Sequence, residues 1–274
     1  MTDIKVLDET GTNATLQHRI SRILAEVVPL VQPTTELELP HLVISRIVSP
    51  QTWQSEQQSQ MDQAFTALRA RQPWWKKPAV VRREAAARSK FRRTAPLLRD
   101  LVMGATVAGP DLLSQTILTP EGLLHTGVTT DEKYLTQVVA HELVHHAQNR
   151  ASRHGARWAA SRSAPPGPAI SVLEEGHARW ADRQITRKLF GTAVDADTAP
   201  RSDHYLRVAG DPRVADMYAA RQIPYTDGCK LVEAAVQGVG IQRLNQVWRD
   251  GLLLPSQSEM SAPELWATRL KTMT

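Results

Sequence analysis

Two histidines and a glutamate are spaced so that they could hold a metal ion and use it. His141 and His145 are four residues apart, so a helix places both imidazoles on one side, one turn apart. Zinc accepts imidazole and carboxylate ligands, and catalytic zinc sites use three protein ligands and one water. Glu142 stands between the pair, where its carboxylate could take a proton from that water. The motif therefore predicts a zinc site with a general base.

The residues before this motif predict that its helix faces the protein core. Leu135, Val138 and Val139 form an apolar stripe at helical spacing, and continuing the stripe by three and four residues reaches the motif. Thr129 and Glu132 have capping-box spacing, which predicts that the helix begins there. Buried imidazole and carboxylate groups are costly unless they are paired or bind metal. This context favours a metal site over a chance match on a solvated helix.

Two histidines alone make a weak site, so a third ligand is needed. The metzincin pattern requires glycine and histidine three and six residues after the second motif histidine. The sequence has Gln148 and Ala151 there, which excludes that class. His154 and His177 remain possible ligands, although neither has a recognised spacing. Glu175 is the third candidate, and a carboxylate is an equally good zinc ligand.

The stretch around Glu175 reads VLEEGHARW over residues 172–180. It resembles the E-G-x-A element on the glutamate helix of gluzincin metallopeptidases. The resemblance implies that Glu175 is the third zinc ligand, on a helix that we expect over residues 171–190. The small residues Gly176 and Ala178 would let two helices approach closely at the metal.

The neighbouring acids must be assigned separate roles. Ser171 and Glu174 have capping-box spacing, which predicts a structural role for Glu174 and leaves Glu175 free. Asp182 lies seven residues after Glu175 on the same helix face, where it could orient a ligand or pair with an arginine. Some gluzincins have an acid four residues after the glutamate ligand, but this chain has Arg179. The partners of the ligands are therefore left open.

Shorter motifs extend the resemblance toward the C-terminus. They are Tyr225-Thr226-Asp227-Gly228, Gly238 to Gly240, residues 244–248 and Pro263-Glu264-Leu265-Trp266. The match to small gluzincin-like proteins covers roughly residues 111–270. It implies an α+β, mostly helical, zincin-like core with a small sheet, an active-site helix and a glutamate helix. It further implies a zinc-dependent metallopeptidase that cleaves peptides or proteins, with Zn²⁺ as its cofactor.

Peptide hydrolysis also needs a donor for the oxyanion that forms at the carbonyl. Tyr225 is the first choice, because gluzincins often use a tyrosine or histidine after the glutamate helix. His204, Tyr205 and Tyr218 are the alternatives.

Composition bounds the remaining function classes. The chain has 274 residues, 42% of them hydrophobic, which suffices for one sizeable core. A single cysteine, Cys229, excludes an intramolecular disulfide and any cysteine-based zinc finger. Residues 1–17 are polar and lack the pattern of a signal peptide, and the apolar stretches are too short to span a bilayer. We therefore expect a soluble cytoplasmic protein without a membrane span.

Positive charge is concentrated in residues 69–99, which hold eleven basic residues and one acid, Glu84. The segment carries +10, so the rest of the chain carries 5 − 10 = −5. A solvated helix face explains such a cluster, and so does an anionic partner. The rival function is thus a nucleic-acid-associated or regulatory protein with a structural or vestigial zinc site. Intact Glu142 argues against a vestigial site.

Periodicity and breakers predict the elements around the motifs. In residues 1–110, we expect a mostly helical region packed on a catalytic region of residues 111–274. The expected elements are a helix over 15–30 ending before Pro29 or Pro33, a strand over 41–48, a helix from Pro50, a basic helix over 82–101, and strands over 115–118 and 123–128. The strand Leu123–Val128 would lead into the zinc helix and could pair with an extended peptide. Pro224 is expected to break the C-terminal helices.

Overall fold

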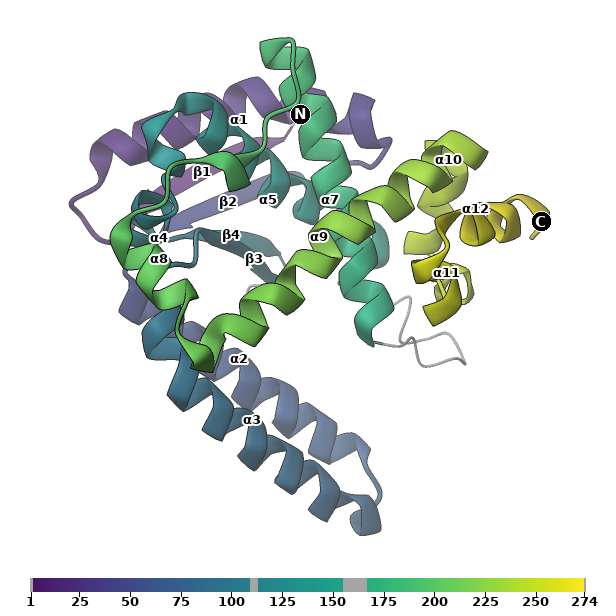
Figure 1. The fold of residues 1–274 in the computed structure, drawn as a ribbon, viewed down its shortest axis with the longest axis horizontal. Helices are drawn as coiled ribbons and strands as arrows, with labels where there is room; N and C mark the ends of the chain where they lie inside the picture. The colour runs from purple at the N-terminus through teal and green to yellow at the C-terminus, as the bar shows by residue number, and fades with distance from the viewer. Residues whose placement is uncertain (1, 109–112, 155–166, 274) are drawn as a thin grey trace.

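Four short strands form one mixed sheet in the computed structural model, which describes residues 2–108, 113–154 and 167–273 (Figure 1). The strands are β1 (Asp3–Asp8), β2 (Leu42–Ile47), β3 (Gly104–Ala108) and β4 (Ser114–Leu118), in the spatial order β1-β2-β4-β3. β1, β2 and β4 run parallel, whereas β3 pairs antiparallel with β4 and forms an edge. The expected strands at 41–48 and 115–118 are confirmed as β2 and β4.

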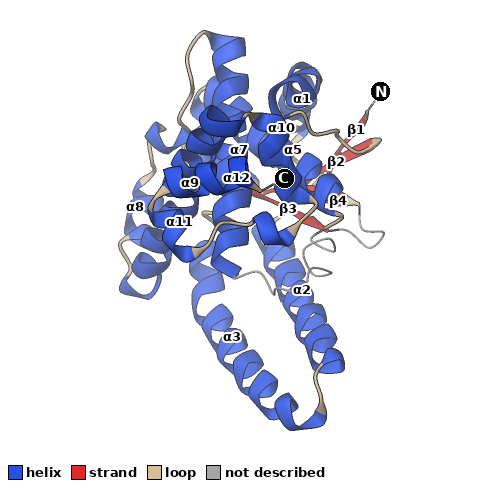
Figure 2. Ribbon diagram, turned by 90° about the vertical axis from the view of Figure 1, so that its right-hand side faces the viewer, coloured by secondary structure: helices blue, strands red, loops and turns tan. Residues whose placement is uncertain are grey.

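Helices make up most of the rest of the chain, so the structure is mostly helical α+β (Figure 2). They are α1 (Ala14–Thr35), α2 (Pro50–Arg71), α3 (Lys77–Leu98), α4 (Pro120–His125), α5 (Glu132–Ser152), α7 (Gly167–Phe190), α8 (Asp203–Ala209), α9 (Pro212–Val239), α10 (Ile241–Leu244), α11 (Gln257–Ser261) and α12 (Pro263–Thr272). α5 packs on β3, β4 and α1, and α7 packs on both α5 and α9. The C-terminal helices α10, α11 and α12 pack on α9. None of the described helices is long and apolar enough to cross a membrane.

α1 is longer than the sequence predicts, because it runs through Pro29 and Pro33 and ends at Thr35. A proline inside a helix removes a backbone hydrogen bond and usually ends or kinks it. Here the buried face continues past the first proline to Val31 and Thr35, so packing against the core outweighs that cost. The expected end before the prolines is therefore wrong.

The strand expected at Leu123–Val128 is also wrong, because residues 120–125 form the short helix α4. Pro120 occupies the first helical turn, where its fixed backbone angle favours a helix and its missing N–H costs nothing. Gly122 lies against the backbone of Val102, where a β-carbon would come within 1.8 Å of a carbonyl oxygen. A short apolar run cannot distinguish strand from helix, and here the proline decides.

α2 and α3 form a hairpin that projects from the body of the molecule (Figures 1 and 2). The expected helix from Pro50 is confirmed, with Ser49 as its N-cap, and so is the basic helix, although α3 begins earlier, at Lys77. A short 3₁₀ turn, η1 (Trp74–Lys76), joins the two helices at the far end. The boundary expected at residue 110 lies outside the described residues. β2, which precedes it in the chain, and β4, which follows it, pair in one sheet.

Candidate metal centre

α5 carries the His-Glu-x-x-His motif and is held in place at its N-terminus. Asp131 caps the helix by accepting a hydrogen bond from the backbone N–H of Lys133 at 2.9 Å. The expected capping box of Thr129 and Glu132 is not formed, because the Glu132 carboxylate instead binds arginines of α1. The motif side of the helix is buried as the apolar stripe predicts, and His141 and Glu142 are each 8% exposed.

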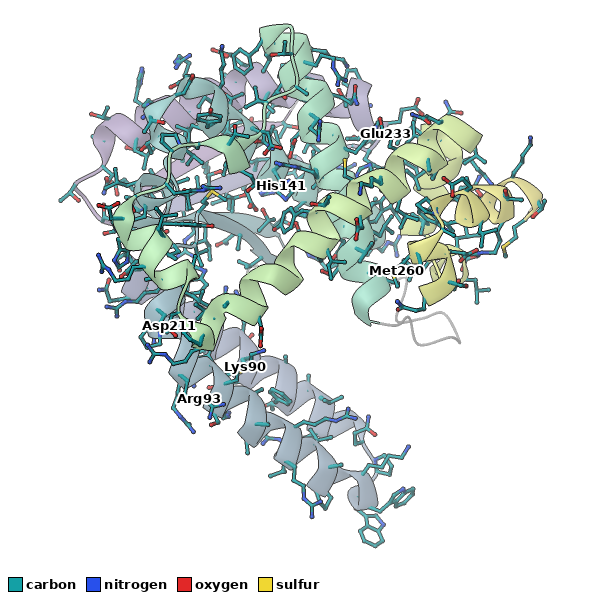
Figure 3. The ribbon with its side chains drawn as sticks, in the orientation of Figure 1. Lys90, Arg93, His141, Asp211, Glu233 and Met260 are labelled. Atoms are coloured by element: carbon teal, nitrogen blue, oxygen red, sulfur yellow. The ribbon has the colours of Figure 1, made fainter. Side chains whose placement is uncertain are left out.

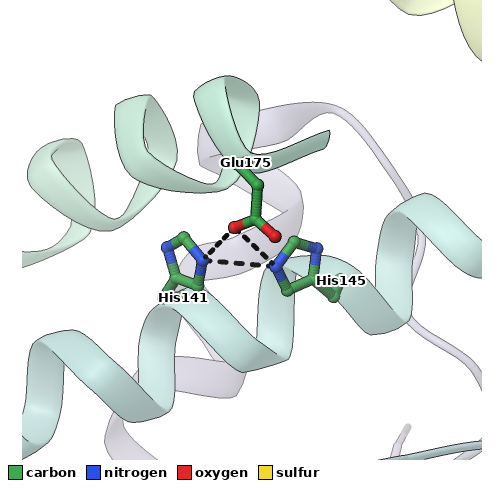
Figure 4. Close-up of side chains that lie close together, drawn as sticks. All are labelled: His141, His145 and Glu175. Atoms are coloured by element: carbon green, nitrogen blue, oxygen red, sulfur yellow. Dashed lines mark hydrogen bonds and ion pairs between the residues drawn. The ribbon is translucent and has the colours of Figure 1, made fainter. Parts of the chain in front are cut away.

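The structure brings His141, His145 and Glu175 together between α5 and α7 (Figure 4). Glu175 Oε2 lies 3.1 Å from Nε2 of His141 and 3.6 Å from Nε2 of His145. The two Nε2 atoms are 3.2 Å apart. Three possible ligand atoms from two helices therefore converge on one point.

The hydrogen bonds on the other side of each imidazole define what these atoms are. Nδ1 of His141 is 3.0 Å from Asp182 Oδ2, and Nδ1 of His145 is 2.7 Å from Gln148 Oε1. Both partners are acceptors, so each Nδ1 carries a proton, and each Nε2 can hold either a second proton or a metal ion. The three facing atoms therefore form a site for a cation, which is a shared proton in the metal-free protein and could be a metal ion.

A zinc ion fits this arrangement. Zinc ligand bonds of about 2.0–2.2 Å in a tetrahedron separate the ligand atoms by roughly 3.3–3.6 Å, close to the distances between the three side chains. The electrostatics agree. Burial lowers the pKa of His141, but its hydrogen bonds to Asp182 and Glu175 outweigh this effect and raise the pKa to about 10. Burial would raise the pKa of Glu175, but the two histidines lower it well below its usual value. The site therefore favours positive charge.

A chain of buried side chains holds His141 in its orientation. The second oxygen of Asp182 accepts a hydrogen bond from Gln137 Nε2 at 3.1 Å, and Gln137 Oε1 accepts one from the backbone N–H of Ala196 at 2.5 Å. Asp182 is fully buried, so its ion pair with His141 and its hydrogen bond from Gln137 replace its lost hydration. Asp182 was expected either to orient a ligand or to pair with an arginine, and it orients His141. The nearby Arg179 forms its ion pairs with Asp195 and Asp197 instead.

Gln148 performs the same task for His145. Its oxygen accepts from His145, while its Nε2 donates to the backbone carbonyl of Glu174 at 2.9 Å and lies 3.1 Å from His177 Nδ1. The residue therefore links α5 to α7 directly beside Glu175. In the sequence Gln148 serves only to exclude the metzincin pattern, because nothing in its spacing reveals which side chain it will reach.

Glu174 and Glu175 differ in their surroundings, but not because Glu174 belongs to a capping box. α7 begins at Gly167, so Ser171 and Glu174 lie inside the helix and form no capping box. Burial raises the pKa of Glu174 to about 7, and its carboxylate is not part of the cluster. The helix turns Glu175 toward α5 instead, because successive residues differ by about 100° around a helix axis.

Glu142 lies beside the cluster and is fixed by the edge strand of the sheet. Thr106 of β3 donates a hydrogen bond to Glu142 Oε2 at 2.7 Å. The Thr106 oxygen is 3.0 Å from the hydroxyl of Thr116, which is 2.9 Å from Nε2 of His146. Burial lowers the pKa of His146 to about 3, so its neutral ring can donate into this chain. His146 thus supports the base from within the core and does not line the cleft.

Tyr225 of α9 packs over the ring of His141, with ring centroids 5.6 Å apart and planes inclined by 25°. The break expected at Pro224 is wrong, because α9 continues through this proline. The close helix approach expected at Gly176 is real, but its partner is α9: a β-carbon on Gly176 would lie 2.2 Å from the backbone of Gly228. This contact sets the distance of Tyr225 from the cluster.

A cleft opens beside His141 and Glu142, next to the start of β3. It is lined by Leu101, Val102, Met103, Gly104, Thr126, Gln137, Val138, His141, Glu142, Arg179, Ala196, Asp197, Arg201, Tyr205 and Tyr225. Tyr205, an alternative oxyanion donor, is thus also at the cleft, where Arg201 lies over its ring at 4.9 Å. Glu142 and Tyr225 open into the same cleft, so a substrate there could contact both.

The other candidate residues lie elsewhere. His204 packs on His125 with centroids 4.5 Å apart, and His125 Nδ1 is 3.0 Å from Ser202 Oγ. His177 is buried beside Gln148, and neither it nor His154 belongs to the cluster formed by the described residues. The side chain of Tyr218 lies outside the described residues.

No protein-family model and no curated protein matches this chain. One solved structure, described as that of a candidate hydrolase with a novel fold from Chloroflexus aurantiacus, is similar over 96% of this chain and 92% of its own. The TM-score is 0.58 and the sequence identity is 15%. At this identity the likeness concerns the fold, so the relation to gluzincins rests on the motifs and stays a prediction.

Proposed function

We propose that this protein is a zinc-dependent hydrolase that cleaves peptide bonds. The observation that carries the proposal is the convergence of three possible ligand atoms, from His141, His145 and Glu175, beside the carboxylate of Glu142. A purely structural zinc site would need no free acid next to its ligands. The fold shared with a candidate hydrolase supports the same general class of reaction.

When bound, zinc would supply a Lewis acid that polarises the substrate carbonyl and lowers the pKa of a water molecule. Glu142 would accept the proton of that water and pass it to the leaving amine. The hydrogen bond from Thr106 leaves Glu142 Oε1 available for this transfer and fixes the carboxylate relative to the ligands. Asp182 and Gln148 would keep both imidazoles in the tautomer that binds metal.

Tyr225 is the proposed donor to the oxyanion. Its ring stacks on His141 and lines the cleft, which supports a role for its hydroxyl beside the reacting carbonyl. Its helix is fixed there by the contact of Gly228 with Gly176. Tyr205 lines the same cleft and is the second candidate for this role.

The proposed substrate is an extended peptide that pairs with β3. Leu123–Val128, the strand expected in this role, contains the end of α4 and a turn, whereas β3 is the sheet edge next to Glu142. Gly104 and Met103 at the start of this edge line the cleft. An edge strand offers backbone N–H and C=O groups to an added strand, which would hold the scissile bond near the base.

The first test separates metal binding from chemistry with Glu142→Gln. The variant keeps the size of the side chain and can still accept from Thr106, but it cannot take a proton. We expect about one zinc per chain in wild type and variant, and a loss of peptide hydrolysis of at least about 10²-fold in the variant. Zinc content and kcat/KM on one peptide found by library cleavage are the measurements. Cleavage at the wild-type rate by the zinc-loaded variant would refute the mechanism.

A matched pair of alanine variants tests the third ligand. Glu175→Ala should lose most of the zinc, whereas Glu174→Ala should retain it, because Gln148 uses only the backbone carbonyl of Glu174. Equal retention in both variants would exclude Glu175 as a ligand.

Tyr225→Phe should keep zinc and lose roughly 10-fold to 10³-fold in kcat if its hydroxyl contacts the oxyanion.

A further inference from the structure

The end of the α2–α3 hairpin exposes two tryptophans in adjacent positions. Trp74 is 77% exposed and Trp75 is 62% exposed, and their rings meet edge to face with centroids 5.8 Å apart. Val81, one turn into α3, is 50% exposed. Single exposed apolar residues are common, but a cluster of large apolar side chains at the end of a projection indicates an interaction surface.

Two groups can be distinguished among the described basic side chains of α2, η1 and α3. Arg69 and Arg88 form ion pairs with the buried Glu84, and Arg88 also pairs with Asp62, so these contacts join α2 to α3. The second group is exposed and forms no ion pair within the described residues: Lys76, Lys77, Arg82, Arg83, Lys90, Arg92 and Arg93. The hairpin therefore carries uncompensated positive charge, and the first of these cations, Lys76 and Lys77, directly follow the tryptophans.

The position along α3 divides this second group again. Arg82 is five residues from Lys77, or about 8 Å along a helix, whereas Lys90 is thirteen residues away, or about 20 Å. Figure 3 shows Lys90 and Arg93 on the part of α3 nearer the body. We define the hairpin tip as Trp74, Trp75, Lys76, Lys77, Arg82 and Arg83, and the hairpin base as Lys90, Arg92 and Arg93.

We propose that the hairpin tip binds the surface of an anionic lipid bilayer. Indole rings favour the membrane interface, where their apolar bodies enter the acyl boundary and their N–H groups stay with the headgroups. Lysine and arginine beside them complement the negative charge of the lipids. The tip is the free end of a projecting helix hairpin (Figure 1), whereas single-stranded nucleic acid stacks on aromatic residues within a basic groove. Shape and charge together favour the bilayer.

Binding of the full-length chain to lipid vesicles tests this proposal without any reference to hydrolysis. Vesicles of phosphatidylcholine with phosphatidylserine should sediment the protein, and vesicles of phosphatidylcholine alone should do so at least about 10-fold more weakly. Each tip cation contributes a factor of about 5, so the triple variant K76Q/K77Q/R82Q should bind on the order of 10²-fold more weakly. The double variant W74A/W75A should weaken binding by about 10-fold or more.

Two matched controls make the test specific. The triple variant K90Q/R92Q/R93Q removes the same charge from the hairpin base, beyond the Debye length of about 10 Å at 0.1 M salt, and should bind within a few-fold of wild type. The double variant L252A/L265A removes exposed apolar residues far from the tip and should not change binding. Circular dichroism checks that each variant is folded.

Three results would overturn the proposal. The first is no sedimentation with phosphatidylserine vesicles, and the second is equal weakening by the tip and base triple variants. The third is tighter binding of a single-stranded oligonucleotide than of these vesicles at the same salt, lost in W74A/W75A, which would assign the tip to nucleic acid. Quenching of tryptophan fluorescence by brominated lipid, reduced in W74F/W75F, would directly support insertion of the two indoles.

Discussion

Asp182 is the residue whose hydrogen bonds most constrain the metal centre. Its two oxygens accept from His141 and Gln137, and Gln137 cannot turn around because its own oxygen accepts from the N–H of Ala196. Both donors are thus fixed by the fold, and only a carboxylate can satisfy both. The orientation of His141 therefore depends on a group that need not touch the metal.

We predict that Asp182→Asn weakens zinc binding by about 10-fold to 100-fold, the usual effect of losing a partner that orients a ligand. Asparagine has one acceptor for two fixed donors, so either His141 or Gln137 loses its hydrogen bond. Competition with a chelator measures the affinity. Asp197→Asn is the control, because Asp197 lines the cleft and pairs only with arginines among the described residues. An equal loss in both variants would mean that Asp182 acts only through its charge.

The candidate ligands and one residue that supports them, Asp182, could be predicted from the sequence, but the other supporting residues could not. Fixed spacing on one helix identifies His141 and His145, and a short motif suggests Glu175, which the structure brings to them. Gln148 and Thr106 reach the site through contacts between elements, α5 with α7 and α5 with β3. Such pairings depend on packing angles that a single sequence does not state.

At the scale of elements, the crossing of α7 and α9 determines how the cleft is built. Gly176 and Gly228 face each other, and a β-carbon on Gly228 would lie 2.3 Å from the carbonyl oxygen of Val172. The helices therefore touch through backbone atoms, which fixes Tyr225 over His141. Gly176, the residue after Glu175, therefore allows α7 to approach α9 closely.

We predict that Gly176→Ala destabilises the protein by about 1–3 kcal/mol, the cost of overpacking a tight contact. It should also lower kcat, because α9 must move away and take Tyr225 with it. Urea unfolding and peptide hydrolysis are the measurements. Gly210→Ala is the control: Gly210 caps α8 with an ordinary negative φ, and its new β-carbon would meet only neighbouring carbonyls, at 3.3 Å and beyond. Equal stability of both variants would contradict the proposed role of the crossing.

Most of the elements that were predicted wrongly share one cause, which is tertiary packing, whereas α4 has a local cause, the proline in its first turn. Prolines predicted breaks in α1 and α9, yet both helices continue because their buried faces extend past Pro29 and Pro224. β1 was missed because its residues alternate between exposed and half-buried positions, and only pairing with β2 makes them a strand. The confirmed elements, such as β2 and α2, carry strong local signals, a β-branched run and a Ser-Pro cap.

At the scale of the whole molecule, the C-terminal segment holds the far end of α9. Trp266 is fully buried, and its ring N–H donates to the carbonyl of Leu253 at 2.9 Å. Arg269 hydrogen-bonds to Glu259 at 2.6 Å and to the carbonyls of Leu252 and Leu254 at 3.0 Å and 2.8 Å. The ion pair therefore fastens α11 to α12 and to the preceding loop. Because α9 also carries Tyr225, this end of the chain supports the cleft indirectly.

The last prediction concerns the loss of stability in acid. Burial would raise the pKa of Glu259, but hydrogen bonds from Arg269 and from Ser256 outweigh it and lower the pKa. A lowered folded-state pKa stabilises the fold above the unfolded-state value of about 4.3, and this contribution disappears as the pH falls through the folded-state pKa. Glu259→Gln should therefore reduce the free energy of unfolding by on the order of 1–2 kcal/mol at pH 7. The difference from wild type should shrink below about pH 4.

Urea unfolding of the metal-free protein between neutral and acidic pH measures this difference, so that zinc release does not contribute to it. Glu264→Gln is the matched control, because it removes the same charge from an exposed position on the first turn of α12. Arg269 also donates to the backbone carbonyls of Leu252, Leu253 and Leu254. A Glu259→Gln variant with the same acid dependence as wild type would show that Arg269 stabilises the C-terminal segment through these carbonyls alone. Arg269→Met would then still destabilise the protein at every pH, because those carbonyls would lose their donor.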